Sequence, residues 1–358
     1  MKFLAVCNHV GGLNALKPII KEIKSINSII VLTNISNKKN FNNLNLPIIY
    51  LKYKISINDA TKFLKENKIK FLITATSEPE DKVVGRLESV FIYSSKKVGI
   101  RSITLIDSWQ KYKERFSLNN KNLLEAIPDK ICALDKKCKE DLIKNGFSKR
   151  NIIISGNPAW EKLNKIYKDL NNIKIQDVYL DLNLSKSSKY IIFISQPISE
   201  RDDYKLPYDE VSVLISLINT IKKLNNSKKN KFILFIKKHP SEKYEKFDSI
   251  IKQNDGLVFF LKENNLSVYE LSKFSIACVG MFSMLLKELE MIGSKVIPYQ
   301  PTSNNNQLIY TGLNQDSIKS EYQLFEKICN INKSTYEHHT EAIPKATSII
   351  LKLIGEIM

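Results

Sequence analysis

Short apolar runs alternate with amphipathic segments along almost the whole chain, and this alternation is the strongest constraint on its fold. The run at 1–7 has the character of a strand, and apolar residues then recur at helical spacing within 13–26. The same order returns in the second half, from the apolar run 190–195 to a last amphipathic helix that ends at Met358. Repeated β/α units predict parallel sheets covered by helices. We therefore expect an α/β protein.

A polar stretch rich in Asn and Lys, residues 166–189, interrupts the alternation. We expect it to link an N-terminal Rossmann-like domain, residues 1–165, to a second Rossmann-like domain, residues 190–340. A C-terminal helix within 341–358 follows and can cross back to the first domain. Two such domains would face a cleft, and ligands would bind there at the carboxyl ends of the strands.

The net charge of +18 raises the question of a nucleic-acid partner. The lysines are spread along all 358 residues beside abundant Asn and Ile, which indicates a compositional bias rather than a binding stripe. We see no local repeat of basic and aromatic residues, so a nucleic-acid-binding module is the least favoured class. Attraction to an anionic membrane surface stays open.

The five cysteines form no C-x-x-C pair and no cluster with metal-ligand spacing. The apolar segment 1–7 is too short for a signal-peptide core, and no apolar run approaches the length that spans a bilayer. We therefore expect a cytoplasmic protein with reduced thiols. We expect no cofactor and require no metal, because the acidic pair Asp202-Asp203 is isolated.

Two segments of the second half suit a phosphate-bearing ligand. Lys237-Lys238-His239-Pro240 follows the apolar run 231–236, and Gly280-Met-Phe-Ser283 follows the run 275–279 and opens a helix. Parallel strands would bring both segments to one edge of the sheet, where the helix start offers backbone N–H groups. Ser195-Gln196 ends the first strand of this half and faces the same edge.

Each of these residues also has a purely structural interpretation. His239 can be a half-buried turn residue, Ser283 an ordinary N-cap, and Glu288, which could reach a ribose hydroxyl, a solvated side chain on a helix face. Strand alternation lets only one of the two lysines share the face of His239. The lysine and proline attached to His239 favour function there.

The first half offers a glycine turn and several possible bases. Gly11 and Gly12 would let the backbone approach a sugar, and His9 precedes them. Carboxylates that could remove a proton follow predicted strands: Glu78, Glu80, Asp81 and Asp107. The segment after Asp107 is dense in side chains that could bind an acceptor sugar, although its aromatic rings could equally pack on the core: Trp109, Tyr112 and Arg115.

Four segments together resemble nucleotide-sugar glycosyltransferases of the GT-B fold and the related non-hydrolysing UDP-N-acetylglucosamine 2-epimerases. They are the Gly11-Gly12 turn, Gly156-Asn157-Pro158, Lys238-His239-Pro240, and Gly280 to Glu288. The third is similar to the His-Pro motif of bacterial sialyltransferases, polysialyltransferases, Kdo transferases and CDP-glycerol-type polymer transferases. Those families often show paired Ser/Thr residues near Ser283, and this chain has no adjacent partner hydroxyl.

The resemblance implies a metal-independent glycosyltransferase of surface-polysaccharide or lipopolysaccharide assembly, with a CMP- or UDP-linked donor and a glycan or lipid-linked acceptor. The implied donor-binding residues are Ser195, Gln196, Lys238, His239, Pro240, Gly280, Ser283 and Glu288. Gly11, Gly12, Trp109, Tyr112 and Arg115 would bind the acceptor, and Asp107, His9 or Glu78 would act in catalysis. The alternative is an isomerase or hydrolase that acts on a UDP-amino sugar.

Overall fold

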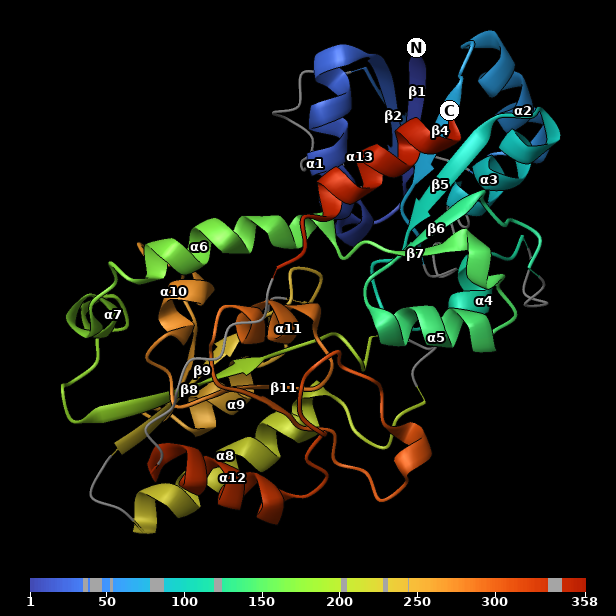
Figure 1. Ribbon diagram of the computed structural model, residues 1–358. Helices are drawn as coiled ribbons and strands as arrows, with labels where there is room; N and C mark the ends of the chain where they lie inside the picture. Colours follow the sequence, from blue (N-terminus) through green and yellow to red (C-terminus); the bar gives the residue numbers. More distant parts are fainter. Residues whose placement is uncertain are drawn as a thin grey trace. The chain divides into compact units, whose positions relative to one another are not determined.

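The computed structural model describes residues 1–34, 38, 47–51, 54–77, 87–118, 124–200, 205–227, 231–243, 245–333 and 343–358. Two compact units make up the chain: Met1–Lys162 with Ile343–Met358, and Leu163–Ala342 (Figure 1). Glu78, Glu80, Asp81 and the pair Asp202-Asp203 lie outside the described residues. Within the described part, no helix combines the length and apolar character needed to cross a bilayer.

The first unit is built on a seven-stranded parallel sheet with the order β3-β2-β1-β4-β5-β6-β7. Its strands are β1 Lys2–Cys7, β2 Ser28–Asn34, β3 Ile48–Leu51, β4 Phe71–Thr74, β5 Arg101–Leu105, β6 Lys130–Ala133 and β7 Ile152–Ile154. Its helices are α1 Val10–Ile26, α2 Ile57–Glu66, α3 Leu87–Lys97, α4 Tyr112–Arg115, α5 Lys136–Lys144, the 3-10 turns Lys149–Asn151 and Pro158–Glu161, and α13 Ala346–Ile357.

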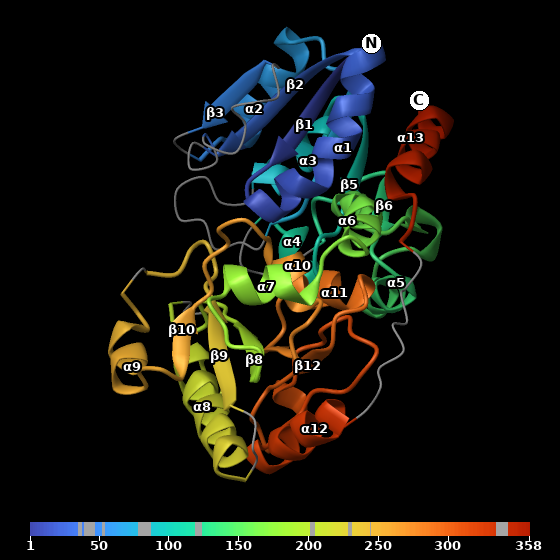
Figure 2. The ribbon, with the colours of Figure 1, turned by 90° about the vertical axis from the view of Figure 1, so that its left-hand side faces the viewer.

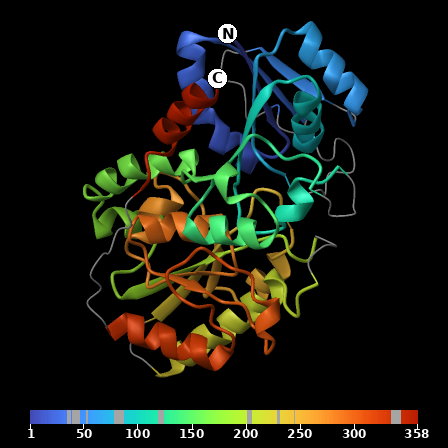
Figure 3. The same cartoon turned by 45° about the vertical axis from the view of Figure 1, so that its right-hand side comes forward.

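The C-terminal helix α13 packs on the first unit, as the sequence suggested. Figure 3 shows it in red beside the dark-blue α1, and Ile350, Leu353 and Ile354 are buried in the same core as β1 and α1. The N–H of Thr347 donates to Glu161 at 2.7 Å and ties the helix start to the turn Pro158–Glu161. Chain ends far apart in sequence therefore share one core.

The second unit is built on a five-stranded parallel sheet with the order β10-β9-β8-β11-β12. Figure 2 shows these strands with α8 and α12 below them. The strands are β8 Ser188–Ile194, β9 Lys231–Lys237, β10 Val258–Phe260, β11 Cys278–Gly280 and β12 Val296–Pro298. The helices are α6 Lys162–Leu170, α7 Ile175–Asp181, α8 Glu210–Ser227, α9 Asp248–Gln253, α10 Val268–Ser272, α11 Met284–Met291, the 3-10 turn Asn305–Gln307, and α12 Glu321–Lys333.

Sequence patterns predict most helices and strands correctly, but a few positions differ in the structure. The expected linker 166–189 carries α7 and part of α6. Both helices have buried apolar residues, Leu163 and Leu170 in α6 and Val178 in α7. The sequence pattern predicts a helix over 242–253, but only its end, α9, is α-helical, because residues 239–242 form a side-chain-bonded turn. The sequence also favours Asn58 as the N-cap of a helix that starts at Asp59, but the helix α2 starts earlier and Ser56 caps it by accepting from the Asp59 N–H at 3.0 Å.

Each sheet has one point where the strand order reverses. In the first unit it lies between β1 and β4, and in the second between β8 and β11. Chains leaving neighbouring strands at such a point turn to opposite faces of the sheet, which opens a crevice at the carboxyl edge where ligands of α/β proteins bind. These two points define where a site is expected in each unit.

Candidate functional site

Three predicted donor-binding segments meet at the carboxyl edge of the five-stranded sheet. Ser195-Gln196 follows β8, His239 follows β9, and the turn that starts at Gly280 follows β11. Since β8 pairs with both β9 and β11 in parallel, the three segments emerge side by side at the switch point. The structure thus brings together what the sequence predicted to converge.

The segment His239 to Glu242 is a tight, self-bonded turn. The His239 N–H donates to Oε2 of Glu242 at 2.7 Å, and the Glu242 N–H donates to the His239 carbonyl at 3.1 Å. The imidazole Nδ1 accepts from the N–H of Ser241 at 3.2 Å. The His239 residue itself is exposed, so the turn presents its ring to solvent.

Glu242 is a buried carboxylate that anchors this turn to the sheet. Its other oxygen, Oε1, accepts from the Ser195 hydroxyl at 2.6 Å, and its side chain is 0% exposed. Burial raises the pKa of Glu242, against the opposing effect of the Ser195 hydrogen bond. The hydroxyl of Ser195, a predicted donor-binding residue, is therefore engaged with Glu242 in this structure.

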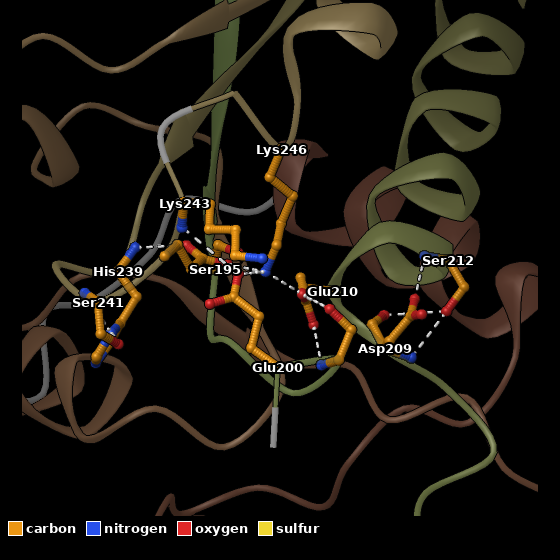
Figure 4. Close-up of polar contacts among 11 residues, drawn as sticks. Ser195, Glu200, Asp209, Glu210, Ser212, His239, Ser241, Lys243 and Lys246 are labelled. Carbon is orange, nitrogen blue, oxygen red and sulfur yellow. Dashed lines mark hydrogen bonds and ion pairs between the residues drawn. The ribbon is translucent and has the colours of Figure 1, made fainter. Parts of the chain in front are cut away.

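A half-buried lysine, Lys246, compensates the charge of the carboxylates around the turn. Lys246 pairs with Glu200 and Glu210 (Figure 4). Its Nζ also lies 3.6 Å from Oε1 of Glu242. Burial by itself would lower the pKa of Lys246, but the bonds to Glu200 and Glu210 outweigh it and the pKa is raised. The ammonium is thus held charged, and it compensates carboxylates that would otherwise be costly to bury.

The turn between β11 and α11 is held close to β8. A Cβ on Gly280 would lie 2.8 Å from the Ile194 carbonyl oxygen, so a side chain is excluded there. Gln196 accepts from the Phe282 N–H at 2.9 Å, and Ser283 caps α11 by accepting from the Leu285 N–H at 3.3 Å. Ser283 therefore serves as an N-cap in this structure, which was its structural interpretation.

The remaining predicted donor residues have protein contacts of their own. Lys237 forms an ion pair with Glu263, and Nζ of Lys238 lies 5.6 Å from the centre of the Phe260 ring. Glu288 accepts a hydrogen bond from the hydroxyl of Tyr269. Lys238 is partly exposed and directly precedes His239, so it lies at the same edge of the sheet.

The first unit has a buried glutamate with the same pattern of partners. Oε1 of Glu88, on α3, accepts from the Asn8 N–H at 2.7 Å and from the hydroxyl of Ser77, so it joins the end of β1 to the chain that leaves β4. Glu88 is 2% exposed. It neighbours the exposed His9, the N-cap residue of α1, whose charge acts on it.

Glu88 differs from Glu242 in one respect. Its second oxygen, Oε2, is buried and has no hydrogen-bond partner among the described residues. Burial raises the pKa of Glu88, and the Ser77 hydrogen bond and the charge of His9 only partly oppose this. A buried carboxyl with one unsatisfied oxygen costs stability, and such groups concentrate at functional sites.

Asp107 follows β5 and is the carboxylate of a buried ion pair. Its Oδ1 accepts from Nη1 of Arg115 at 2.8 Å and from the Thr76 hydroxyl at 3.1 Å. Its Oδ2 faces the start of α1, since a Cβ on Gly11 would lie 3.3 Å from that oxygen. The second carboxylate oxygen of Asp107 thus lies near the exposed Gly11, while the first is held by Arg115 and Thr76.

The predicted acceptor-binding aromatic residues are buried. Trp109 is 6% exposed, stacks on Trp160 and donates from Nε1 to Asp135 at 2.8 Å, and Tyr112 is 5% exposed. Arg115, 4% exposed, donates to the Gln110 carbonyl besides Asp107. A stacked sugar needs an open ring face, so the expected stacking role of Trp109 and Tyr112 does not fit this structure, and we assign them to the core. Arg115 is buried as well and holds Oδ1 of Asp107.

Sequence reasoning missed both anchoring glutamates, Glu88 and Glu242. A weak sequence signal exists for Glu88, an acidic residue near the apolar Leu87, Val90 and Phe91 at the start of a helix. No group of three or more His, Cys, Asp or Glu side chains in the described part of the chain is placed to hold a metal ion.

No protein-family model and no curated protein matches the chain. Solved structures do. A UDP-GlcNAc 2-epimerase from Neisseria meningitidis bound to UDP-GlcNAc is 13% identical over 99% of this chain and 100% of that one, with a TM-score of 0.68. A UDP-GlcNAc 2-epimerase from Methanocaldococcus jannaschii in complex with UDP-GlcNAc and UDP is 14% identical over 99% and 100%, with a TM-score of 0.61. MurG from Acinetobacter baumannii is 9% identical over 99% of both chains, with a TM-score of 0.54.

These likenesses, together with the two parallel sheets, define the class. The chain has a GT-B-type fold of two Rossmann-like units, as the sequence predicted. At such low identities the comparison establishes the fold alone. The finer resemblance to transferases with a His-Pro motif stays a prediction.

Proposed function

We propose that the protein is an enzyme that acts on a UDP-linked sugar and transfers the sugar to a glycan or lipid-linked acceptor. The observation that carries this proposal is the convergence of His239, Gln196 and the α11 start at the switch point of the second unit. UDP is favoured over CMP because similar structures of the same fold are described with UDP-GlcNAc and UDP.

The second unit would stabilise the departing nucleotide phosphate. His239 is exposed at the sheet edge, Lys238 lies beside it, and α11 directs its N-terminus to the same edge. A helix start carries partial positive charge, and donors fixed before the reaction stabilise charge that develops during it. Loss of a phosphate from a sugar is a reaction in which such charge develops on the leaving group.

The first unit would supply acid–base groups for the acceptor hydroxyl. His9 is exposed, and Asp107 keeps one oxygen beside Gly11. Gly12 admits no side chain, since a Cβ there would lie 2.5 Å from that of Ala75, so α1 packs close to the chain that follows β4. Glu78, the other predicted catalytic carboxylate, lies outside the described residues and stays a prediction.

Two further assignments follow from this function. We propose a role in surface-polysaccharide or lipopolysaccharide assembly, because a sugar transferred to a lipid-linked acceptor enters such polymers. The net charge of +18 would favour peripheral association with an anionic inner membrane face, where such acceptors reside.

Epimerisation of a UDP-amino sugar is the second candidate. It is favoured by one observation: the UDP-GlcNAc 2-epimerases match with TM-scores of 0.68 and 0.61, against 0.54 for MurG. The same nucleotide site would serve both reactions, and the acid–base groups of the first unit would then act on the sugar ring.

Thermal shift with UDP, CMP, ADP and UDP-GlcNAc tests the shared site, since a ligand that binds the folded state raises its stability. We expect UDP and UDP-GlcNAc to raise the melting temperature and CMP and ADP to do less. NMR of UDP-GlcNAc incubated with the protein then separates the reactions: the C2 epimer indicates the epimerase, and UDP released only with added glycan indicates the transferase. The proposal is wrong if no nucleotide stabilises the protein.

A further inference from the structure

The hydrogen bonds around His239 determine where its imidazole carries a proton. A backbone N–H can only donate, and that of Ser241 points to Nδ1 of His239 at 3.2 Å. Nδ1 therefore presents its lone pair, and the neutral ring carries its proton on Nε2. The hydroxyl of Ser241 lies 2.7 Å from the same Nδ1, which adds a second contact on that side of the ring.

Glu242 fixes the backbone that aims this N–H. Its carboxylate accepts from the His239 N–H at 2.7 Å while its own N–H donates to the His239 carbonyl at 3.1 Å, so the two residues close a ring of reciprocal bonds. Pro240 restricts the backbone between them. The hydroxyl of Ser195 holds the far oxygen of Glu242 at 2.6 Å and ties the turn to the end of β8.

The anchor itself does not reach solvent. The Glu242 side chain is 0% exposed, and its charge is compensated by Lys246 at 3.6 Å. It can therefore influence a ligand only through the residue that it holds. A phosphate oxygen accepts hydrogen bonds, so an imidazole with Nε2–H attracts it, whereas a lone pair on Nε2 repels it.

We propose that Glu242 is a positioning residue that holds His239 as the Nε2–H tautomer, so that this N–H serves as a hydrogen-bond donor to the phosphate of the nucleotide. The phosphate half of this statement rests on the proposed function. The tautomer half rests on the turn alone, so the two halves can fail separately.

The test is ¹⁵N NMR of the imidazole nitrogens, combined with calorimetric titration with UDP. The chain has only 4 histidines, so His239→Ala assigns the relevant signals. In the wild type we expect the Nε2–H tautomer. In Glu242→Ala we expect a mixture of tautomers and about tenfold weaker UDP binding, which corresponds to about 1.4 kcal/mol.

Three variants separate positioning from a general loss of structure. Ser241→Ala keeps the backbone N–H and should keep the tautomer. Glu200→Ala removes another partner of Lys246 and a 3.5 Å contact with the Lys243 N–H, but no bond to residues 239–242, and should also keep the tautomer. Glu242→Gln retains an acceptor for the His239 N–H and should rescue both tautomer and affinity.

If Glu242→Ala does not fold, Glu242→Asp decides, because its shorter side chain cannot reach the His239 N–H and the Ser195 hydroxyl together. An Nδ1–H tautomer in the wild type would overturn the proposal. So would an unchanged tautomer and unchanged UDP affinity in the folded variant. A wild-type Nε2–H tautomer that the variant disturbs, in a protein that binds no nucleotide, would support the positioning role and overturn the proposed function.

Discussion

The buried carboxyl of Glu88 leads to a prediction whose sign depends on pH. Glu88 is 2% exposed, and its Oε2 has no partner among the described residues. The substitution Glu88→Gln keeps the size of the side chain and an oxygen that can accept from the Asn8 N–H and the Ser77 hydroxyl, but it removes the ionisable group. We expect this variant to be more stable than the wild type at neutral and alkaline pH. At acidic pH this advantage in stability should be smaller.

The size of the effect follows from linkage. Burial raises the pKa of Glu88 above its ordinary value of 4.5, so the folded state holds this proton more tightly than the unfolded state. The stability that the protonated carboxyl contributes is complete below pH 4.5 and is lost as the pH rises through the folded-state pKa. Glutamine does not titrate. The advantage of the variant should therefore grow across this window by about 1.4 kcal/mol for every pH unit by which burial raises the pKa.

Urea denaturation followed by tryptophan fluorescence measures the stability of the first structural unit, which contains Glu88. The chain has 2 tryptophans, Trp109 and Trp160, and both are buried in the first unit with Glu88. The matched control is Glu66→Gln. Glu66 is an exposed glutamate of α2 whose Oε1 lies 3.8 Å from Nζ of Lys62. The difference in unfolding free energy between this variant and the wild type should depend little on pH. A Glu88→Gln variant that is less stable at every pH, or whose difference from the wild type does not change between pH 4 and 8, would refute the reasoning.

Two further predictions concern packing and charge in the same unit. Arg115→Met should lower the free energy of unfolding by about 3–5 kcal/mol, because it leaves the Asp107 carboxylate without its buried cation, and a loss below about 1 kcal/mol in urea denaturation would contradict this. Gly12→Ala should cost about 1–3 kcal/mol, because the added Cβ would lie 2.5 Å from that of Ala75. Gly11→Ala is its control, since its Cβ meets only a side-chain oxygen at 3.3 Å; equal melting temperatures for the two variants would show that α1 is less closely packed than described.

The features that sequence predicts best are those that depend on neighbours along the chain. The apolar runs became strands, and Gly146 and Gly293 end helices with φ of 96° and 83°, as only glycine does readily. The spacing of Ser267 and Glu270 predicts a capping box, which forms at the start of α10, where the carboxylate of Glu270 accepts from the Ser267 N–H at 2.7 Å. Each of these requires only residues that are four or fewer positions apart.

The parts that sequence did not predict depend on side chains brought together by the fold. Glu88 is bound by Ser77, which is 11 residues away, and Glu242 by Ser195, which is 47 residues away. Neither separation along the sequence matches the spacing of a helix or a strand, so a single sequence does not reveal these contacts. Trp109 carries the same lesson in the opposite direction: an aromatic residue in a polar loop suggests a sugar platform until the stacking partner from another segment is known.

The central claim is that the carboxyl edge of the second unit binds the phosphate of a nucleotide through His239. Calorimetric titration with UDP of the wild type and of His239→Ala tests it most directly, with thermal melting of both proteins as the check on folding. We expect the wild type to bind UDP and the variant to bind it about tenfold more weakly. The melting temperature of the variant should be nearly unchanged, because the ring of His239 is exposed. Equal affinities in the two proteins, or a variant that no longer folds, would contradict it.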